Sequence, residues 1–204
     1  PWRGYPVYTG LYAGAPVVVA RSGVGKSLSA MIAQRLIDAY RPEAVIFTGL
    51  AGSIHPDIEI GDVIVAEDTL QYDMDARPLG FQLGEIPYTP HRVIACDPDL
   101  VTRAAATRLP EGSVHRGRIL TGDRFVNRGA FQEMGFLRSE LKGDAVEMEG
   151  ASVALVALIN EIPCVVVRTI SDKADTNARV DFARFLPRAS ENSALVVTEI
   201  LRRS

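Results

Sequence analysis

The sequence of 204 residues is long enough for one domain with a full hydrophobic core, and 47% of its residues are hydrophobic. Its 22 lysines and arginines against 25 aspartates and glutamates give a net charge of −3, which excludes nucleic-acid binding through bulk charge. No apolar run approaches the roughly 18 residues typical of a membrane-spanning helix, and the first residues do not resemble a signal peptide. We therefore expect a cytoplasmic protein that binds neither nucleic acid nor membranes.

The two cysteines and three histidines of the chain predict neither a disulfide framework nor a metal centre. Cys96 and Cys164 lie in apolar stretches, which is typical of buried, reduced thiols. The histidines lack the spacing of metal ligands; they are His55, His91 and His115. We expect no metal and no cofactor.

A hairpin and a helix are the first elements expected along the chain. Tyr5–Tyr12 and Pro16–Arg21 carry β-branched and aromatic residues around Gly14, which predicts two strands joined by a glycine turn. Lys26–Tyr40 has apolar residues at helical spacing, and Pro42 prevents this helix from continuing.

Short apolar strands and amphipathic helices alternate over the rest of the chain. The strand Ala44–Thr48 is expected to end in a glycine-rich turn at 48–53, and a polar stretch over 67–90 follows the strand Asp62–Ala66. The remaining expected elements are the helix Leu100–Arg108, the strand Arg118–Thr121, the helix Ala130–Arg138, the strand Asp144–Glu147, the helix Ser152–Asn160, the strand Pro163–Ser171 and the helix Phe182–Arg203, bent at Pro187.

This alternation predicts an α/β fold around a mostly buried sheet, because the strands are apolar on both faces and helices separate them. In such sheets, ligands bind beyond the carboxyl ends of the strands. The segments that follow the expected strands, and that should therefore form the site, are 48–53, 122–127, 147–149 and 171–175.

The segment Ser22–Ser27 resembles the end of a phosphate-binding P-loop between a strand and a helix. Ala20 stands where that motif requires its first glycine, and no strand ending in an acidic magnesium ligand accompanies it. A tight turn before a helix is therefore favoured over nucleoside triphosphate hydrolysis. Backbone N–H groups at a helix start still favour an anion or the polar edge of a ligand.

Charged and aromatic residues in the strand-end segments suggest a polar ligand with a flat ring. Phe125 could stack on a heterocycle, although a core position is the commoner role of phenylalanine. Glu147 and Glu149 flank Met148 between an apolar strand and an apolar helix, where unpaired charges are costly. A helix-start role explains Glu149 but not Glu147, whereas two carboxylates in a dry pocket would accept hydrogen bonds from a pair of sugar hydroxyls.

The strongest core strand continues into a cation and an acid. Arg168 lies within the apolar run, where an unpaired cation is costly, so we expect it to pair with one of the two glutamates. Asp172 follows at the mouth of the strand, where it could act on a ligand in the crevice or, like Asp175, cap a helix.

Together, these motifs resemble those of one enzyme family. The nucleoside phosphorylase/hydrolase superfamily has, in the same order and at similar spacing, motifs like Ser22–Lys26, Thr48–Gly52, Gly122–Phe125, Val146–Glu149 and Ile170–Asp175. The resemblance covers essentially the whole chain. Within the superfamily the sequence looks most similar to the 5′-methylthioadenosine/S-adenosylhomocysteine nucleosidases.

The resemblance implies a three-layer α/β/α sandwich around a mixed, partly barrel-like sheet, formed as a single domain over residues 1–204. It also implies that the family's first strand and helix would precede Pro1. The implied reaction is hydrolysis of the N9–C1′ bond of an adenine nucleoside. Its transition state would be dissociative, with positive charge on the ribose and negative charge on the leaving base.

The resemblance assigns expected roles to the strand-end residues. Asp172 would protonate N7 of the base, and Ser171 would hold that acid in place. Phe125 would stack on adenine, while the backbone of Val126 would read the adenine edge. The residues expected around the ribose and along the pocket wall are Met148, Glu149, Glu147, Arg168, Phe182, Val24 and Gly52.

A homodimer is also expected. The segment 71–90 carries many apolar side chains, and a long loop of this kind usually covers another part of the protein or binds a partner. By resemblance, the residues that would wall the neighbouring subunit's pocket for the 5′ substituent are Ala76, Leu79, Phe81 and Pro87.

Two features depart from the family pattern. Leu50 stands where the family usually has a small polar residue, which alters one contact near the ribose or the attacking water. The family's water-activating glutamate lies on the strand before the first hairpin, so we expect this general base to be absent from the 204 residues. Either the sequence is incomplete at its start or the protein has lost that group.

Three other functions stay open from the sequence. Phosphorolysis is disfavoured because the related phosphorylases have an arginine where this chain has Ile46 and Phe47, and phosphate needs a cationic partner. Hydrolysis of futalosine or aminodeoxyfutalosine uses the same scaffold. A catalytically silent nucleoside-binding protein would also fit a chain without the glutamate.

Overall fold

The computed structural model describes residues 2–126, 134–173 and 178–202, apart from the side chains of residues 178–184. The strands are β1 (Val7–Tyr12), β2 (Ala15–Ala20), β3 (Val45–Ser53), β4 (Val63–Gln71), β5 (Val93–Ala95), β6 (Val114–Thr121), β7 (Ala145–Glu147) and β8 (Cys164–Asp172). The helices are α1 (Lys26–Tyr40), α2 (Pro98–Ala105), α4 (Phe136–Ser139), α5 (Gly150–Ile159) and α6 (Ala178–Arg202), with a short 3-10 helix η1 (Arg77–Leu79).

The central sheet closes into a barrel-like ring. Its strands follow the order β4-β6-β7-β3-β8, and β8 returns to pair with β4. The pairs β3–β8, β4–β6 and β6–β7 are parallel, whereas β3–β7 and β4–β8 are antiparallel. The short strand β5 adds to β4 outside the ring. This mixed, partly barrel-like sheet confirms the predicted α/β fold.

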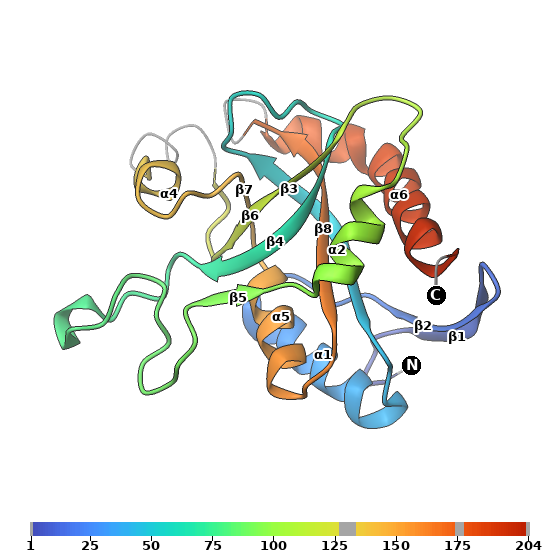
Figure 1. Cartoon of the computed structure of the whole chain (residues 1–204), viewed down its shortest axis with the longest axis horizontal. Coiled ribbons are helices and arrows are strands. Elements are labelled where there is room, and N and C mark those ends of the chain that lie inside the picture. The colour runs from blue at the N-terminus through green and yellow to red at the C-terminus, as the bar shows by residue number, and fades with distance from the viewer. Residues whose placement is uncertain (1, 127–133, 174–177, 203–204) are drawn as a thin grey trace.

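Helices cover the barrel in two groups (Figure 1). α1 and α5 pack against each other on one side of the sheet, and α2 and α6 lie together on the other side. Between them every residue of β8 is buried. Burial on both faces explains why the first part of β8, Cys164–Val167, is continuously apolar in the sequence.

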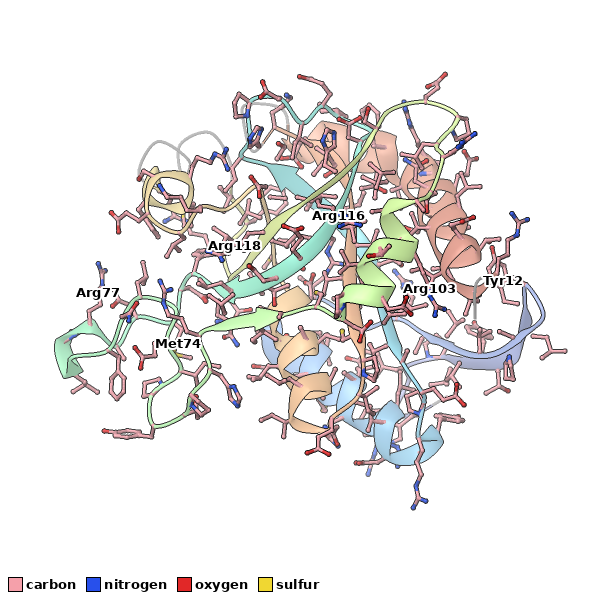
Figure 2. The ribbon with its side chains drawn as sticks, viewed as in Figure 1. Tyr12, Met74, Arg77, Arg103, Arg116 and Arg118 are labelled. Carbon is pink, nitrogen blue, oxygen red and sulfur yellow. The ribbon has the colours of Figure 1, made fainter. Side chains whose placement is uncertain are left out.

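Two segments extend from this body (Figure 1). The hairpin of β1 and β2 lies beside α6, where the hydroxyl of Tyr12 is 2.9 Å from Thr198 Oγ1 and donates to Ala194 O at 3.3 Å (Figure 2). The second extension is an arm formed by residues 72–92 between β4 and β5, and it includes η1. Met74 and Arg77 lie on this arm (Figure 2).

The glycine-rich segment 48–53 is part of β3 and not the predicted turn. β8 runs parallel to β3 and pairs with it through this segment, with only a bulge between Ala51 and Gly52. The prediction was wrong because pairing partners distant in the sequence keep the glycines extended. The strand β5 and the helix η1 were also not predicted, and β4 and β6 are longer than expected.

The helices agree more closely with the predictions. α1 has the predicted bounds, and α5 begins two residues before the predicted helix Ser152–Asn160. α6 contains Pro187 within the helix, as expected. The predicted helix Ala130–Arg138 begins in residues that lie outside the described part of the chain, and α4 covers only its end.

The described residues also bear on the cysteines, on metal ions and on membranes. Both cysteines are free and buried, as predicted, and burial raises the pKa of Cys96 to about 11. In the part of the chain that the structure describes, no His, Cys, Asp and Glu cluster of three or more could hold a metal ion. No helix among these residues is both long and apolar enough to cross a membrane.

Candidate active site

The ends of four strands, β3, β6, β7 and β8, meet at one edge of the barrel. Gly52 near the end of β3 pairs with Val146 of β7 on one side and with Asp172 of β8 on the other. Thr121, which ends β6, pairs with Glu147, which ends β7. The pairing therefore brings together residues from the strand-end segments that the sequence analysis singled out.

A buried ion pair lies under this edge. Arg168 Nη2 is 2.5 Å from Glu147 Oε2, and the two side chains are 1% and 2% exposed. The sequence-based expectation that Arg168 pairs with a nearby glutamate is thus confirmed. Breaking such a pair by removing one partner leaves an uncompensated buried charge, which typically costs about 3–5 kcal/mol.

Gly49 allows this ion pair to form across a strand. Arg168 lies on β8 and Glu147 on β7, and β3 runs between these two strands. Gly49 of β3 pairs with Arg168, and a Cβ atom at Gly49 would lie 2.7 Å from Arg168 Nη1. The guanidinium also covers the ring of Phe47 with its carbon 4.4 Å from the ring centroid. A side chain at position 49 would obstruct the arginine.

Glu147 also holds the start of α5. Its carboxylate accepts hydrogen bonds from the N–H of Gly150 at 2.7 and 2.8 Å and from the N–H of Glu149 at 3.0 Å. The hydroxyl of Thr121 donates to the same carboxylate. Glu147 therefore performs the helix-start role that the sequence analysis considered for Glu149, because its charge faces the N–H groups of the first turn.

Glu149 is the more accessible of the two carboxylates. Its side chain is 16% exposed, and its Oε2 lies 3.9 Å from Arg168 Nη2. Its Oε1 accepts a hydrogen bond from the N–H of Gly25 at 2.8 Å. The pKa of Glu149 is raised, mainly by burial and also by the negative charge of Glu147. The hydrogen bond from the N–H of Gly25 acts in the opposite direction.

The start of α1 is occupied by carboxylates from distant parts of the chain. The N–H of Gly25 donates to Glu149, and the N–H of Lys26 donates to Asp123 Oδ1 at 2.9 Å. Gly25 has a φ of 91°, and α1 has no side-chain cap of its own. These contacts explain why the P-loop-like segment Ser22–Ser27 offers little to a phosphate, since the N–H groups that would bind an anion already bind carboxylates.

Asp172 is a buried acid at the end of β8. It is 4% exposed, and the hydroxyl of Ser171 lies 2.7 Å from its Oδ2 and 3.4 Å from Ala51 O. The next residue, Lys173, pairs with Glu59 at 2.7 Å and so attaches this strand end to the connection between β3 and β4. A buried carboxyl with a hydroxyl partner can exchange a proton with a ligand atom.

A loop after β6 carries an exposed aromatic ring. Phe125 is 50% exposed, while the adjacent Val126 is buried in the smaller of the two core clusters. The hydroxyl of Tyr72 donates to Arg124 O at 3.2 Å, and burial, followed by the charge of Asp73, raises the pKa of Tyr72 to about 12. A ring that is exposed on a loop anchored in this way can stack on a flat ligand.

Other expected site residues are less tightly connected to this centre. Val24 is 71% exposed next to Gly25, and Met148 lies half-buried between the two glutamates. The side chain of Phe182 lies outside the described residues. Ala76, Leu79, Phe81 and Pro87 are on the projecting arm, where Leu79 is 69% exposed.

Several residues that support the site were not predicted from the sequence. Thr121, Asp73 and Lys26 each contact an expected site segment, although none was assigned a role from the sequence. Asp73 and Thr121 end or follow β4 and β6, so the rule that ligands bind beyond strand ends could have found them. Lys26 was considered as part of a phosphate-binding motif, as the start of the helix and as the end of the family motif Ser22–Lys26, but its side chain was given no role.

Comparisons with known proteins agree with this geometry. The sequence profile of the phosphorylase superfamily matches residues 1–202. A 5′-methylthioadenosine/S-adenosylhomocysteine nucleosidase from Exiguobacterium sp. is 36% identical over 202 residues, which are 98% of this chain and 85% of the relative.

Solved structures are similar over the whole chain. The nucleosidase of that name from Neisseria meningitidis, in complex with methylthio-immucillin-A, has a TM-score of 0.92 at 33% identity, covering 100% of this chain and 88% of the other. A futalosine hydrolase mutant from Helicobacter pylori has a TM-score of 0.91 at 34% identity, with coverages of 100% and 88%.

Proposed function

Because this chain belongs to the phosphorylase superfamily, we propose that it hydrolyses the N-glycosidic bond of 5′-methylthioadenosine and S-adenosylhomocysteine and releases adenine. The observation that carries the proposal is the buried Asp172 with its Ser171 partner, one strand from Gly52, in a chain whose relatives bear that enzyme name. The chain is thus a purine nucleosidase.

Asp172 acts on the leaving group in this proposal. When the N9–C1′ bond breaks, its electron pair stays on the base, and Asp172 donates a proton to N7 as that negative charge develops. Ser171 fixes the orientation of the carboxyl through their 2.7 Å contact. Proton donation of this kind contributes about 10²–10⁴-fold to a rate.

Glu149 and Met148 contact the ribose. The Glu149 carboxylate accepts hydrogen bonds from ribose hydroxyls, and hydrogen bonds to a charged acceptor are about twice as strong as neutral ones. Its negative charge also favours the positive charge that builds on the sugar. Glu147 and Arg168 neutralise each other beneath it, so their contribution is to hold Glu149 and the start of α5 in position.

The adenine ring binds beside the loop after β6. Phe125 stacks on the base, and the backbone of Val126 contacts the adenine edge. Val24 and Gly52 line the sugar side through their backbone. The exposed ring of Phe125 beside the buried Val126 supports this arrangement.

Water is favoured over phosphate as the nucleophile. Ile46 and Phe47 on β3 are apolar, and phosphate requires cationic donors. Arg168 directs its Nε and Nη2 groups to Glu147, and the first N–H groups of α1 bind carboxylates. These donors therefore already have carboxylate partners.

The deciding experiment follows adenine release from 5′-methylthioadenosine with and without phosphate and identifies the sugar product. We expect equal rates in both conditions and free methylthioribose as the product. The variant Asp172→Asn serves as the inactive control. A methylthioribose 1-phosphate product would refute hydrolysis, and absence of adenine release by the complete protein would refute the proposed function.

A second candidate is hydrolysis of futalosine or aminodeoxyfutalosine. It is favoured by the structural similarity to the Helicobacter pylori protein named futalosine hydrolase. A comparison of kcat/KM for these nucleosides with that for 5′-methylthioadenosine separates the candidates. The substrate with the highest kcat/KM identifies the activity.

A homodimer completes the proposal. Ala76, Leu79, Phe81 and Pro87 lie on the arm that extends from the body, so they can reach a second copy and wall its 5′-substituent pocket. Leu79 is 69% exposed, which suits an interface residue. Light scattering should show a dimer, and Leu79→Asp should yield monomers with a raised KM; a fully active monomer would contradict this arrangement.

A further inference from the structure

Three segments near the candidate site meet at the side chain of Lys26. Its ammonium lies 2.6 Å from Asp73 Oδ1 and 3.9 Å from Asp123 Oδ2, and its side chain is 17% exposed. Its backbone N–H donates to Asp123 Oδ1, and the N–H of Asp123 donates to Asp73 Oδ2 at 2.8 Å. These contacts join the start of α1, the turn after β4 and the loop after β6 in one closed network, the Lys26 network.

One side of the Lys26 network leads to the carboxylate that we assign to the ribose. Gly25 precedes Lys26, and its N–H donates to Glu149 Oε1 at 2.8 Å. Gly25 needs its positive φ of 91°, and a Cβ at this position would lie 3.3 Å from Asp123 Oδ1. The first turn of α1 therefore packs closely against both carboxylates, and a shift of this turn would move the donor away from Glu149.

The other side of the Lys26 network leads to the ring that we assign to the base. Asp123 precedes Phe125 by two residues on the same loop. Asp73 and the adjacent Tyr72 both hold this loop, Asp73 through the N–H of Asp123 and Tyr72 through the carbonyl of Arg124. The loop with the aromatic ring is thus attached to the same cation as the Glu149 donor.

We propose that Lys26, Asp73 and Asp123 are positioning residues that couple the ribose acceptor Glu149 to the base-stacking ring Phe125. The roles of these two groups rest on the proposed function. The Lys26 network sets the distance between the groups that bind the two halves of a nucleoside, and none of its members touches the reacting atoms.

The physical reason for the coupling is charge balance. Without the ammonium, Asp73 and Asp123 would be two like charges held together by a single backbone hydrogen bond. Their separation would draw Asp123 away from the N–H of Lys26 and loosen the neighbouring contact between Gly25 and Glu149. Both binding groups would lose their alignment together.

The test replaces the ammonium with an apolar side chain of similar length. Lys26→Met should raise KM by about 10–100-fold, since misplacement of binding groups by about 1 Å has effects of this size. kcat should fall by less than KM rises, because proton donation by Asp172 does not depend on these contacts, whereas a shift of Glu149 weakens both ribose binding and the stabilisation of charge on the sugar. Lys26→Arg restores the charge and should recover most of the affinity.

Arg118→Met is the matched control. Arg118 pairs with Asp68 at 2.5 Å, both side chains are 23% exposed, and the pair joins β4 to β6 upstream of the loops in question (Figure 2). This variant should lower the melting temperature without changing KM. A purely structural role of Lys26 would give the same result, so the KM difference between the two variants separates positioning from stability.

Amide hydrogen exchange provides a readout that does not need turnover. Lys26→Met should accelerate exchange in residues 22–26 and 122–126 together, whereas Arg118→Met should accelerate neither. Faster exchange in only one of the two segments, or a KM of Lys26→Met equal to that of the wild type, would overturn the coupling. If the wild-type protein releases no adenine, the proposed function fails, and the exchange result alone then decides the coupling.

Discussion

Gly49→Ala tests whether the buried ion pair depends on the absence of a side chain on β3. The new Cβ would lie 2.7 Å from Arg168 Nη1 and 3.2 Å from Arg168 Cζ, whereas the backbone at Gly49 does not require a positive φ. The substitution therefore adds a steric conflict without backbone strain. Because Arg168 is 1% exposed and paired with Glu147, its guanidinium has little room to move.

The expected cost follows from these contacts. Overpacking a tightly filled site lowers the free energy of unfolding by about 1–3 kcal/mol, and loss of the ion pair would extend this to about 3–5 kcal/mol. For a chain of this size each 1 kcal/mol corresponds to about 2–4 °C in melting temperature. kcat/KM should also fall, since Glu147 holds the backbone of Glu149.

Thermal unfolding and urea titration of Gly49→Ala measure this cost, and Gly135→Ala is the control. Nothing lies within 4 Å of a Cβ at Gly135, and its φ of −54° suits alanine. The control should match the wild type or gain up to about 1 kcal/mol, because alanine restricts the unfolded chain. A Gly49→Ala protein within about 0.5 kcal/mol of the wild type would refute the steric role of Gly49, since changes of that size are typical of unimportant surface sites.

Three further predictions concern titratable groups. Asp172→Asn should lower kcat by about 10²–10⁴-fold in a stopped assay with unchanged circular dichroism, and a variant that keeps more than about a tenth of the rate would remove Asp172 from the mechanism. Because burial raises the pKa of Glu149, its carboxylate should protonate at a higher pH than an ordinary glutamate. KM should therefore rise as the pH falls through that pKa. Glu149→Gln should have a high KM that does not change over this pH range. Burial raises the pKa of Asp62, but hydrogen bonds from the N–H groups of Glu59 and Ser113 and from His115 lower it overall. Its stabilising contribution should be full above the unfolded-state pKa of about 3.9 and should be lost as the pH falls through the lower folded-state pKa. Asp62→Asn should therefore lower the free energy of unfolding at pH 7 and weaken its decrease at acidic pH.

Local patterns in the sequence were sufficient for the helices α1, α2, α5 and α6 and for part of the site. The bounds of α1 follow from apolar spacing and from Pro42, which are properties of neighbouring residues. The cost of an unpaired buried cation predicted a glutamate partner for Arg168, and the structure identifies it as Glu147. These inferences succeed because the relevant energies depend on residue type and near neighbours.

Other features depend on pairings between distant parts of the chain. Segment 48–53 is extended because β8, more than a hundred residues later, pairs with it, so its glycines do not form the turn that local rules favour. The roles of the two glutamates are also set by tertiary contacts, since Arg168, Thr121 and the start of α5 surround Glu147 and only Glu149 keeps an accessible oxygen.

The sequence by itself determined the class of fold, the positions of the helices and which strand ends carry polar groups, because composition and periodicity are local quantities. Only the tertiary structure decided that the sheet closes by pairing of β4 with β8. It also decided that the missing side chain of Gly49 leaves space for the guanidinium of Arg168, and that Lys26 contacts both Asp73 and Asp123. The physical reason is that closure, steric clearance and ion pairing depend on distances across the barrel, and residues far apart in the chain set those distances.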